Sequence, residues 1–338
     1  MKVLVLGGTG FLGPEIVESL IARKHTVTLF NRGKSHPTLF PDVEKLIGDR
    51  NSDLKALENR SWDVVIDVPA SLPSWVIKTT ELLKKNVKRY VFVSTISVFN
   101  DFAKAGINED GPKFEAPESL DTETKITNEL YGPLKLRCED IVNKAYASNA
   151  TIVRPGLIVG PNDPTDRFTY WPVRVDKGGD ILAPGDGSSL VQFVDARDLG
   201  EFIAKLIDDG HNGIYNATGP ASPLRFDEFL YGCRAATSSK MKFVWADEKF
   251  LLDNQVGPFM EMTMWVPGDD MAGFMKVDCS KAISHGLTFR PVSQTACDTM
   301  DWVKTRPDTY KWQAGLLADK EQALLTKWKA HSTTRPAK

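Results

Sequence analysis

The sequence predicts an α/β protein built on a doubly wound parallel sheet, with a smaller substrate domain toward the C-terminus. Three observations predict it. Short apolar runs alternate with amphipathic stretches over the first half of the chain, as in βαβ units. A glycine-rich turn directly follows the first apolar run. Beyond Arg154 the alternation gives way to aromatic, proline-rich and glycine-rich segments, which suit a domain laid over the sheet.

Six apolar runs predict the strands, and amphipathic stretches between them predict the helices. The strands are expected at residues 3–6, 27–30, 46–47, 64–66, 90–93 and 151–153. Helices are expected from Pro14, over residues 76–83, and from the region of Tyr131 onward. We expect a dinucleotide-binding domain over residues 1–155, to which the region 190–220 returns. A substrate-binding domain over 156–310 and a C-terminal helix and tail over 311–338 follow.

Composition excludes several classes of protein. The 338 residues are 42% hydrophobic and 25% charged, which is ordinary for a globular protein. A formal net charge of -2 gives no reason to expect nucleic acid as a partner. Four widely spaced cysteines, without a histidine at ligand spacing, predict neither a disulfide framework nor a metal site. The first apolar run is too short for a signal peptide and no window could span a membrane, so we expect a cytoplasmic protein.

The turn after the first strand carries the pattern of a dinucleotide site. Residues 7–13 read Gly-Gly-Thr-Gly-Phe-Leu-Gly and lie between a predicted strand and a predicted helix. Glycines there allow a sharp turn and close approach of a pyrophosphate, and the helix N-terminus offers free N–H groups to it. The candidate cofactor-binding residues are Gly7, Thr9, Gly10, Phe11, Leu12, Gly13, Asn31, Arg32, Lys34, Asp49, Arg50, Val68 and Pro155.

The end of the second strand favours NADP over NAD. An NAD site usually has an acidic residue there, which holds the ribose 2′-hydroxyl. This chain has Asn31, Arg32 and Lys34 instead, and the two cations could pair with a 2′-phosphate. The less favoured interpretation is that they are solvated cations on a surface loop, so NAD stays the alternative. Asp49 could accept a hydrogen bond from the adenine amine, or be an ordinary loop aspartate.

Tyr131 and Lys135 are the candidate acid/base pair. Four residues apart on a helix, they lie on one face, and Pro133 places Tyr131 near the helix N-terminus. A phenol with an ordinary pKa of about 10 is a poor base at neutral pH, and a nearby ammonium is expected to lower that pKa. The tyrosine could then exchange a proton with a substrate oxygen during hydride transfer.

Hydroxyl groups follow the fifth predicted strand, where α/β sheets place ligands. Ser94 or Thr95 could donate a hydrogen bond to the substrate oxygen, whereas for Ser97 a bond to its own loop is the preferred interpretation.

Taken together, these residues resemble the extended short-chain dehydrogenase/reductase family, which includes NAD-dependent epimerases and dehydratases. The resemblance runs from about residue 1 to residue 302. It includes the glycine run, the Tyr-x-x-x-Lys pattern, and the segments at residues 154–161, 193–198 and 278–287. The resemblance implies a Rossmann domain with a small C-terminal domain, and a homodimer formed by paired helices. It also implies Tyr131 as acid/base, Lys135 on the nicotinamide ribose, and Thr95, or alternatively Ser94, as hydroxyl donor.

Departures from that family bear on the substrate. The nucleotide-sugar epimerases of that family share an arginine that binds the diphosphate of the substrate. At the corresponding stretch this chain has Leu190, Val191 and Gln192. Where its dehydratases carry an Asp-Glu pair, this chain has Ile96 and Ser97. The interval from Thr95 to Tyr131 is long and acidic, which would disfavour a polyanion near the cleft, although a solvated loop is the preferred interpretation.

Three functions remain open. A reductase or dehydrogenase acting on a compact, sugar-like or other hydroxyl/carbonyl compound is favoured. An epimerase that retains NAD, with Arg167 or Arg174 as a substitute anchor, comes second. A non-catalytic dinucleotide sensor comes third, because fold alone does not settle function. Four aromatic residues are weak candidates for the substrate pocket, since aromatic side chains more often lie in a core; they are Phe168, Tyr170, Trp171 and Trp265.

Overall fold

In the computed structural model, which describes residues 1–333, segments between residues 2 and 217 form a seven-stranded sheet. Its order is β11–β6–β5–β4–β1–β2–β3, and all neighbouring strands are parallel. The doubly wound sheet is thereby confirmed, and each of the six predicted strands lies within one of its members. The strands are β1 (Lys2–Leu6), β2 (Thr26–Asn31), β3 (Glu44–Ile47), β4 (Trp62–Asp67), β5 (Val87–Val93), β6 (Ala150–Pro155) and β11 (Gly213–Ala217).

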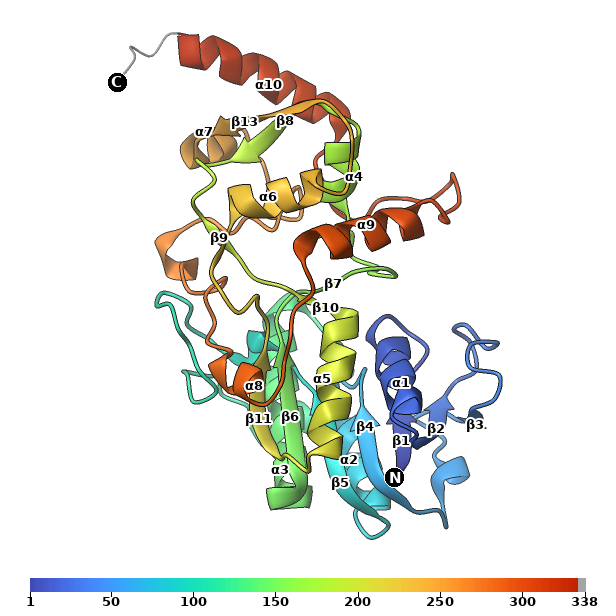
Figure 1. The fold of residues 1–338 in the computed structure, drawn as a ribbon. Coiled ribbons are helices and arrows are strands. Elements are labelled where there is room, and N and C mark those ends of the chain that lie inside the picture. Colours follow the sequence, from blue (N-terminus) through green and yellow to red (C-terminus); the bar gives the residue numbers. More distant parts are fainter. Residues whose placement is uncertain (334–338) are drawn as a thin grey trace.

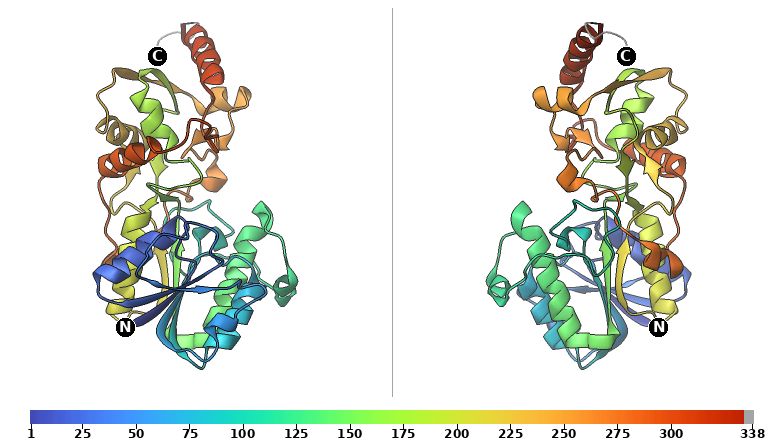
Figure 2. Two further views of the ribbon diagram at one scale, coloured as in Figure 1. Left: turned by 90° about the vertical axis from the view of Figure 1, so that its right-hand side faces the viewer. Right: turned by 90° about the vertical axis from the view of Figure 1, so that its left-hand side faces the viewer.

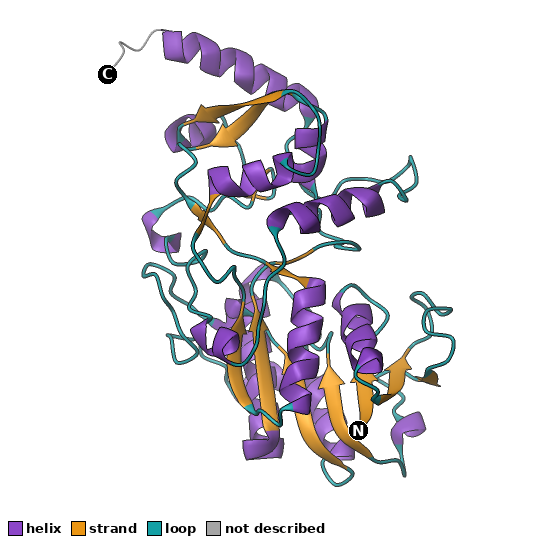
Figure 3. Cartoon of the chain, viewed as in Figure 1, coloured by secondary structure: helices purple, strands orange, loops and turns teal. Residues whose placement is uncertain are grey.

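Helices cover both faces of the sheet (Figures 1 and 3). On one face α1 (Leu12–Ala22) packs beside α5 (Ala196–Asp208), and on the other α2 (Pro73–Leu83) packs beside α3 (Asn128–Tyr146). Val3 and Val5 of β1 pack beneath α1 and α5, and Leu4 and Leu6 pack beneath α2 and α3. Because β1 is buried on both faces of the sheet, its residues form an uninterrupted apolar run.

Two helices begin earlier than their prolines predict. α1 starts at Leu12, so Pro14 is its third residue, where a missing N–H removes no intrahelical hydrogen bond. α3 starts at Asn128, where Thr127 caps it by accepting a hydrogen bond from the Leu130 N–H at 3.3 Å. Tyr131 therefore lies in the first turn, as predicted, but Pro133 lies inside the helix and not at its start.

A second core lies beyond the carboxyl ends of the strands, at the far end of the elongated molecule (Figure 2). The parallel pair β8 (Gly179–Pro184) and β13 (Met241–Ala246) contributes to it. The helices around it are α4 (Tyr170–Asp176), α6 (Phe226–Arg234), α7 (Glu248–Asp253), α9 (Val292–Val303) and α10 (Ala318–Thr333). Leu324 and Leu325 bury α10 against this core. The end of the predicted tail, residues 334–338, lies outside the described residues.

Short elements complete the chain. The paired strands are β7 (Ile158–Val159) with β10 (Val194–Asp195), β9 (Leu190–Val191) with β12 (Leu224–Arg225), and β14 (Pro258–Phe259) with β15 (Met262–Thr263). Single helical turns are η1 (Lys55–Leu57), η2 (Ile96–Val98), η3 (Glu118–Thr122), η4 (Ala147–Asn149) and η5 (Asp269–Met271), and α8 (Ser280–Ser284) is a short helix.

The segment 193–198, one of those that resemble the family, joins the two cores. Asp195 caps α5 through the Arg197 N–H and accepts a hydrogen bond from the Thr295 hydroxyl of α9 at 2.8 Å. Arg197 also forms an ion pair with Asp298 of α9. This network fixes α9 of the second core against the end of the sheet. The domain boundaries at residues 155 and 310 remain a prediction.

Candidate active site

The glycine-rich turn has the geometry of a dinucleotide cradle. Gly7 and Gly8 have φ of 102° and 89°, a backbone conformation that other residues rarely adopt. A Cβ on Gly13 would lie 2.6 Å from the Gly8 Cα, so helix and turn pack closely there. A Cβ on Gly10, by contrast, would have no heavy atom within 4 Å. Phe11 gives α1 no side-chain cap, so the first N–H groups of the helix can bind an anion.

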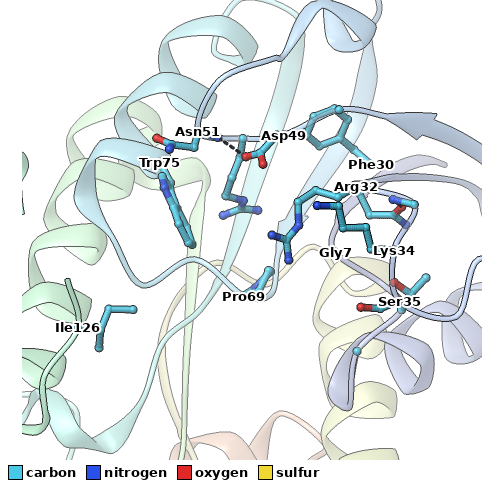
Figure 4. Close-up of a pocket in the computed structure, with 16 residues that line it drawn as sticks. Gly7, Phe30, Arg32, Lys34, Ser35, Asp49, Asn51, Pro69, Trp75 and Ile126 are labelled. Atoms are coloured by element: carbon cyan, nitrogen blue, oxygen red, sulfur yellow. Dashed lines mark hydrogen bonds between the residues drawn. The ribbon is translucent and has the colours of Figure 1, made fainter. Parts of the chain in front are cut away.

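A cavity of about 540 Å³ adjoins this turn (Figure 4). Arg32 and Lys34 extend into it from the loop after β2, and no ion pair occupies either cation within residues 1–333. Asn31 accepts a hydrogen bond from the Gly33 N–H at 2.8 Å, which holds that loop in a turn. The lining residues are Gly7, Thr9, Gly10, Phe30, Asn31, Arg32, Gly33, Lys34, Ser35, Gly48, Asp49, Arg50, Asn51, Pro69, Trp75 and Ile126.

Arg50 and Asp67 form a buried ion pair in the wall of the cavity. Arg50 Nη2 lies 2.8 Å from Asp67 Oδ1, and the Tyr90 hydroxyl donates to Asp67 Oδ2 at 2.7 Å. The contact lacks hydrogen-bond geometry, so both Nη atoms of Arg50 are buried without a hydrogen-bond partner in the described chain. Burial works to lower the pKa of Arg50, but the Asp67 carboxylate outweighs it and raises that pKa. These unpartnered donors and the open cradle at Gly10 fit a bound dinucleotide.

The other predicted cofactor residues differ in whether they line the cavity. Asp49 lines the cavity, but its Oδ1 accepts a hydrogen bond from the Asn51 N–H at 2.9 Å, as a turn aspartate does. Val68 extends β4 by donating its N–H to the Leu6 carbonyl at 3.3 Å. Pro155 ends β6 opposite Ala217, and the Leu12 side chain belongs to the core beneath α1. Trp75 and Ile126 line the cavity without having been predicted, because they come from distant segments of the chain.

Tyr131 meets Thr95 beyond the carboxyl end of β5. Thr95 Oγ1 accepts a hydrogen bond from the Ser97 N–H and donates one to the Ser97 hydroxyl, both at 3.1 Å. Burial raises the pKa of Tyr131, while the nearby Thr95 hydroxyl and the charge of Arg167 oppose that rise. The predicted lowering of the Tyr131 pKa is therefore wrong. A phenol in this environment is protonated at neutral pH and can donate a proton.

Lys135 occupies a different position from the one expected beside Tyr131. Its Nζ donates hydrogen bonds to the carbonyls of Ala70 at 2.7 Å and Val93 at 2.6 Å, and lies 4.3 Å from the Phe92 ring centroid. Burial lowers the pKa of Lys135 to about 8. The ammonium thus ties α3 to the ends of β4 and β5, and contact between Lys135 and a nicotinamide ribose stays a prediction.

Ser94 belongs to a buried polar network and not to the surface around Tyr131. Its hydroxyl donates to Glu139, whose carboxylate also accepts hydrogen bonds from Arg154 at 2.6–3.2 Å. Arg154 further donates to the Glu109 carbonyl, and the Glu109 carboxylate accepts from the Asn216 N–H. Of the two alternatives, Thr95 is therefore the hydroxyl that the structure brings to Tyr131. Glu109, from the acidic interval, ties its loop to the sheet.

The four aromatic candidates for the pocket wall are corrected. Phe168 and Trp171 are 0% exposed, and Tyr170 and Trp265 are 7% and 4% exposed. All four lie in the second core, where the Trp171 indole donates to the Thr263 carbonyl at 2.9 Å. Their aromatic type signalled burial and not binding. Arg167, which the sequence suggested only as a substitute anchor, and Asp163, which was not predicted, lie on the loop just before Phe168.

The fold and this site define a class: a Rossmann-type dinucleotide-binding protein with a tyrosine and a hydroxyl group at the end of the fifth strand. More specifically, the chain belongs to the NAD dependent epimerase/dehydratase family, whose model matches residues 3–218. The family resemblance stated from the sequence is thereby confirmed.

Individual relatives are distant. Epimerase family protein SDR39U1 of Bos taurus is 26% identical over 247 residues, which cover 68% of this chain and 78% of that protein. A crystal structure of human SDR39U1 with NADPH superposes with a TM-score of 0.59 at 19% identity, covering 89% of this chain and 99% of that one. UDP-glucuronic acid 4-epimerase from Bacillus cereus, in complex with NAD, gives 0.61 at 17% identity, covering 90% and 99%. Further relatives are named as reductases, epimerases and a decarboxylase.

The described residues contain neither a membrane-spanning helix nor a cluster of metal ligands. Among residues 1–333, no helix has the length and apolar character needed to cross a membrane. Within the same residues, no group of three or more His, Cys, Asp or Glu side chains could hold a metal ion.

Proposed function

We propose that the protein is an NADP-dependent reductase or dehydrogenase that acts on a compact hydroxyl or carbonyl compound, with Tyr131 as its acid/base. The observation that carries this proposal is the meeting of Tyr131 and Thr95 beyond the end of β5, on the side of the sheet that carries the dinucleotide cavity. Ligands of open α/β sheets bind at the carboxyl ends of the strands, where these two residues lie.

A bound reduced nicotinamide would supply a hydride to the carbonyl carbon of the substrate. Tyr131 then gives its hydroxyl proton to the carbonyl oxygen as the C=O π bond opens, and the product is the alcohol. Thr95, whose single hydroxyl proton is donated to Ser97 in the free protein, would turn that proton to the same oxygen and hold the oxygen beside the phenol. The raised pKa of Tyr131 suits this direction, because the phenol is protonated before the reaction.

A preference for NADP is supported by the loop after β2. Arg32 and Lys34 reach into the cavity, and Asn31 uses its side-chain oxygen to close the turn. No carboxylate stands at the end of β2 to repel a 2′-phosphate. NADPH in the related human structure agrees with this preference, whereas other similar structures hold NAD.

A compact substrate is supported by Gln192. Its amide donates to the Val277 carbonyl at 3.0 Å and accepts from the Val277 N–H at 2.9 Å. In the stretch where family epimerases bind a diphosphate, the Gln192 side chain is therefore bonded to the Val277 backbone. One related reductase is named for 2-alkyl-3-oxoalkanoates, which are carbonyl compounds without a diphosphate.

Cofactor identity is the first test. Nucleotide is released from freshly purified protein with acid and identified, and the apoprotein is titrated with NADPH and NADH. An empty site that binds NADPH more tightly supports an exchanging reductase. Stoichiometric NAD that stays bound through purification supports an epimerase and contradicts the proposal. The expected homodimer and cytoplasmic location remain predictions, and sedimentation velocity tests the former.

Catalysis by Tyr131 is tested with Tyr131→Phe. General acid/base catalysis contributes about 10²–10⁴-fold, so turnover should fall by that factor while the Kd for NADPH stays unchanged. Tyr146→Phe is the matched control, because its hydroxyl is buried on the same helix without a hydrogen-bond partner. Full turnover in Tyr131→Phe would show that another group supplies the proton.

A further inference from the structure

Arg167 extends from the loop between β7 and α4 with part of its guanidinium uncommitted. Its Nε donates to Thr165 Oγ1 at 3.2 Å, and its guanidinium carbon lies 4.8 Å from the ring centroid of Phe259. Neither Nη atom has a hydrogen-bonding or ionic partner within residues 1–333. Arg154, by contrast, uses Nε and both Nη atoms on Glu139 and Glu109. Arg154 is 1% exposed, whereas Arg167 is only partly buried, so the outer nitrogens of Arg167 remain open to a ligand.

Asp163 holds this arginine in place. The aspartate is 0% exposed, and its Oδ1 accepts hydrogen bonds from both the N–H and the hydroxyl of Thr165 at 2.8 Å. Thr165 in turn receives the Arg167 Nε–H. Burial lowers the pKa of Arg167, and the charge of Asp163 opposes that change. The loop 163–167 thus fixes a cation whose two outer nitrogens remain available.

A chain of aromatic rings connects this cation to the catalytic end of the sheet. The Phe259 ring lies 5.8 Å from Phe274, which lies 5.0 Å from Phe102. Phe102 packs in one cluster with Ile96, the residue after Thr95. The charge of Arg167 also acts on the Tyr131 phenol. Arg167 therefore lies within electrostatic reach of the phenol that we propose as the acid.

We propose that Arg167 is a specificity-determining residue that binds a carboxylate of the substrate, so that the enzyme acts on an oxo acid or hydroxy acid. This inference rests on the proposed function. A guanidinium presents two parallel N–H groups that match the two oxygens of a carboxylate. One cation matches one negative charge, and Gln192, bonded to Val277, adds no second anchor for a diphosphate. Lys135 is buried between α3 and the sheet and is bonded to two carbonyls, so it does not supply a second cation for the substrate.

The test compares acids with their neutral esters on the protein loaded with NADP⁺. The probes are acetoacetate with methyl acetoacetate and pyruvate with methyl pyruvate, measured by calorimetric titration. The wild type should bind at least one acid about tenfold to a hundredfold more tightly than its ester. Arg167→Gln should abolish that preference, and Arg167→Lys should retain part of it because the charge stays. Arg60→Gln, which removes an exposed cation paired with Glu44, should change nothing.

Two outcomes would overturn the inference. One is equal or weaker binding of both acids by the wild type, and the other is an Arg167→Gln variant that weakens acid and ester alike. Thermal unfolding shows whether each variant is folded. Turnover of the same four compounds with NADPH tests the proposed function separately. Preference for acids without turnover would contradict the proposed reductase and support the carboxylate site. Turnover without a preference for acids would support the reductase and contradict the carboxylate site.

Discussion

Lys135 is a buried ammonium, so the stability of the protein should rise with pH as this group loses its proton. Burial lowers its pKa from the ordinary 10.5 to about 8. Between these two values the unfolded chain binds a proton that the folded chain has released. The free energy of unfolding therefore increases from pH 8 upward. A shift of this size corresponds to about 3 kcal/mol, because each pKa unit is about 1.4 kcal/mol.

Urea unfolding of the wild type and of Lys135→Met would measure this effect. Several tyrosines and cysteines have raised pKa values in the folded protein, so in this pH range they lose protons mainly in the unfolded chain and lower the stability. The wild type and the variant must therefore be compared with each other. The stability of the wild type relative to the variant should increase by about 3 kcal/mol between about pH 7.5 and about pH 10.5. Lys55→Met, which removes an exposed lysine, should show no such change.

A difference that does not change with pH would refute the reasoning. It would mean that the Lys135 Nζ has an ordinary pKa and is solvated, so that the two hydrogen bonds to Ala70 and Val93 do not hold it in the folded protein. Below pH 8 the sign of the substitution is not fixed by this argument, because methionine removes a buried charge but leaves two carbonyls without a donor.

Other changes test the cofactor pocket and the two cores. Arg32→Glu should weaken NADPH binding at least about tenfold relative to NADH, and Lys55→Glu should not; equal weakening of both cofactors would contradict the 2′-phosphate assignment. Trp171→Ala should lower the free energy of unfolding by about 3–5 kcal/mol, because the indole is fully buried, and a loss below about 1 kcal/mol in urea would contradict that packing. Glu139→Gln should cost about 3–5 kcal/mol by leaving Arg154 buried without its counter-charge, and chemical denaturation near neutral pH measures it.

Local patterns made the sheet and the cofactor cradle predictable. The run from β1 through the glycines into α1 is contiguous, and each of its residues has a backbone reason to be there. The positions of Tyr131 in the first turn of α3 and of Thr95 after β5 were also predictable from local features, whereas their roles in catalysis stay predictions. Asn31, Arg32 and Lys34 could be chosen as candidates because they lie at or just after the end of β2.

Tertiary contacts made the rest unpredictable. The spacing of Tyr131 and Lys135 puts both on one helix face. The lysine nevertheless reaches the carbonyls of Ala70, in the loop after β4, and Val93, at the end of β5, which that spacing could not predict. Phe168 and Trp171 looked like a pocket wall only because their burial is set by segments about 60 to 90 residues away, at Phe229 and Thr263. Asp163 carries no sequence signal at all, since its partner Thr165 is an ordinary loop residue.

The division of the site between two bodies has a consequence for substitutions. β5 and α3 place Thr95 and Tyr131, and the turn after β1 shapes the cofactor cavity, so all of these belong to the sheet. Arg167 directly precedes Phe168 of the second core, and Phe259 packs against that core. The second core is tied to the sheet through Asp195, Arg197 and α9. Changes in the loop 163–167 should therefore alter the KM for an acid substrate while the Kd for NADPH stays constant. Changes at Arg32 should do the opposite, because each body supplies a different ligand contact.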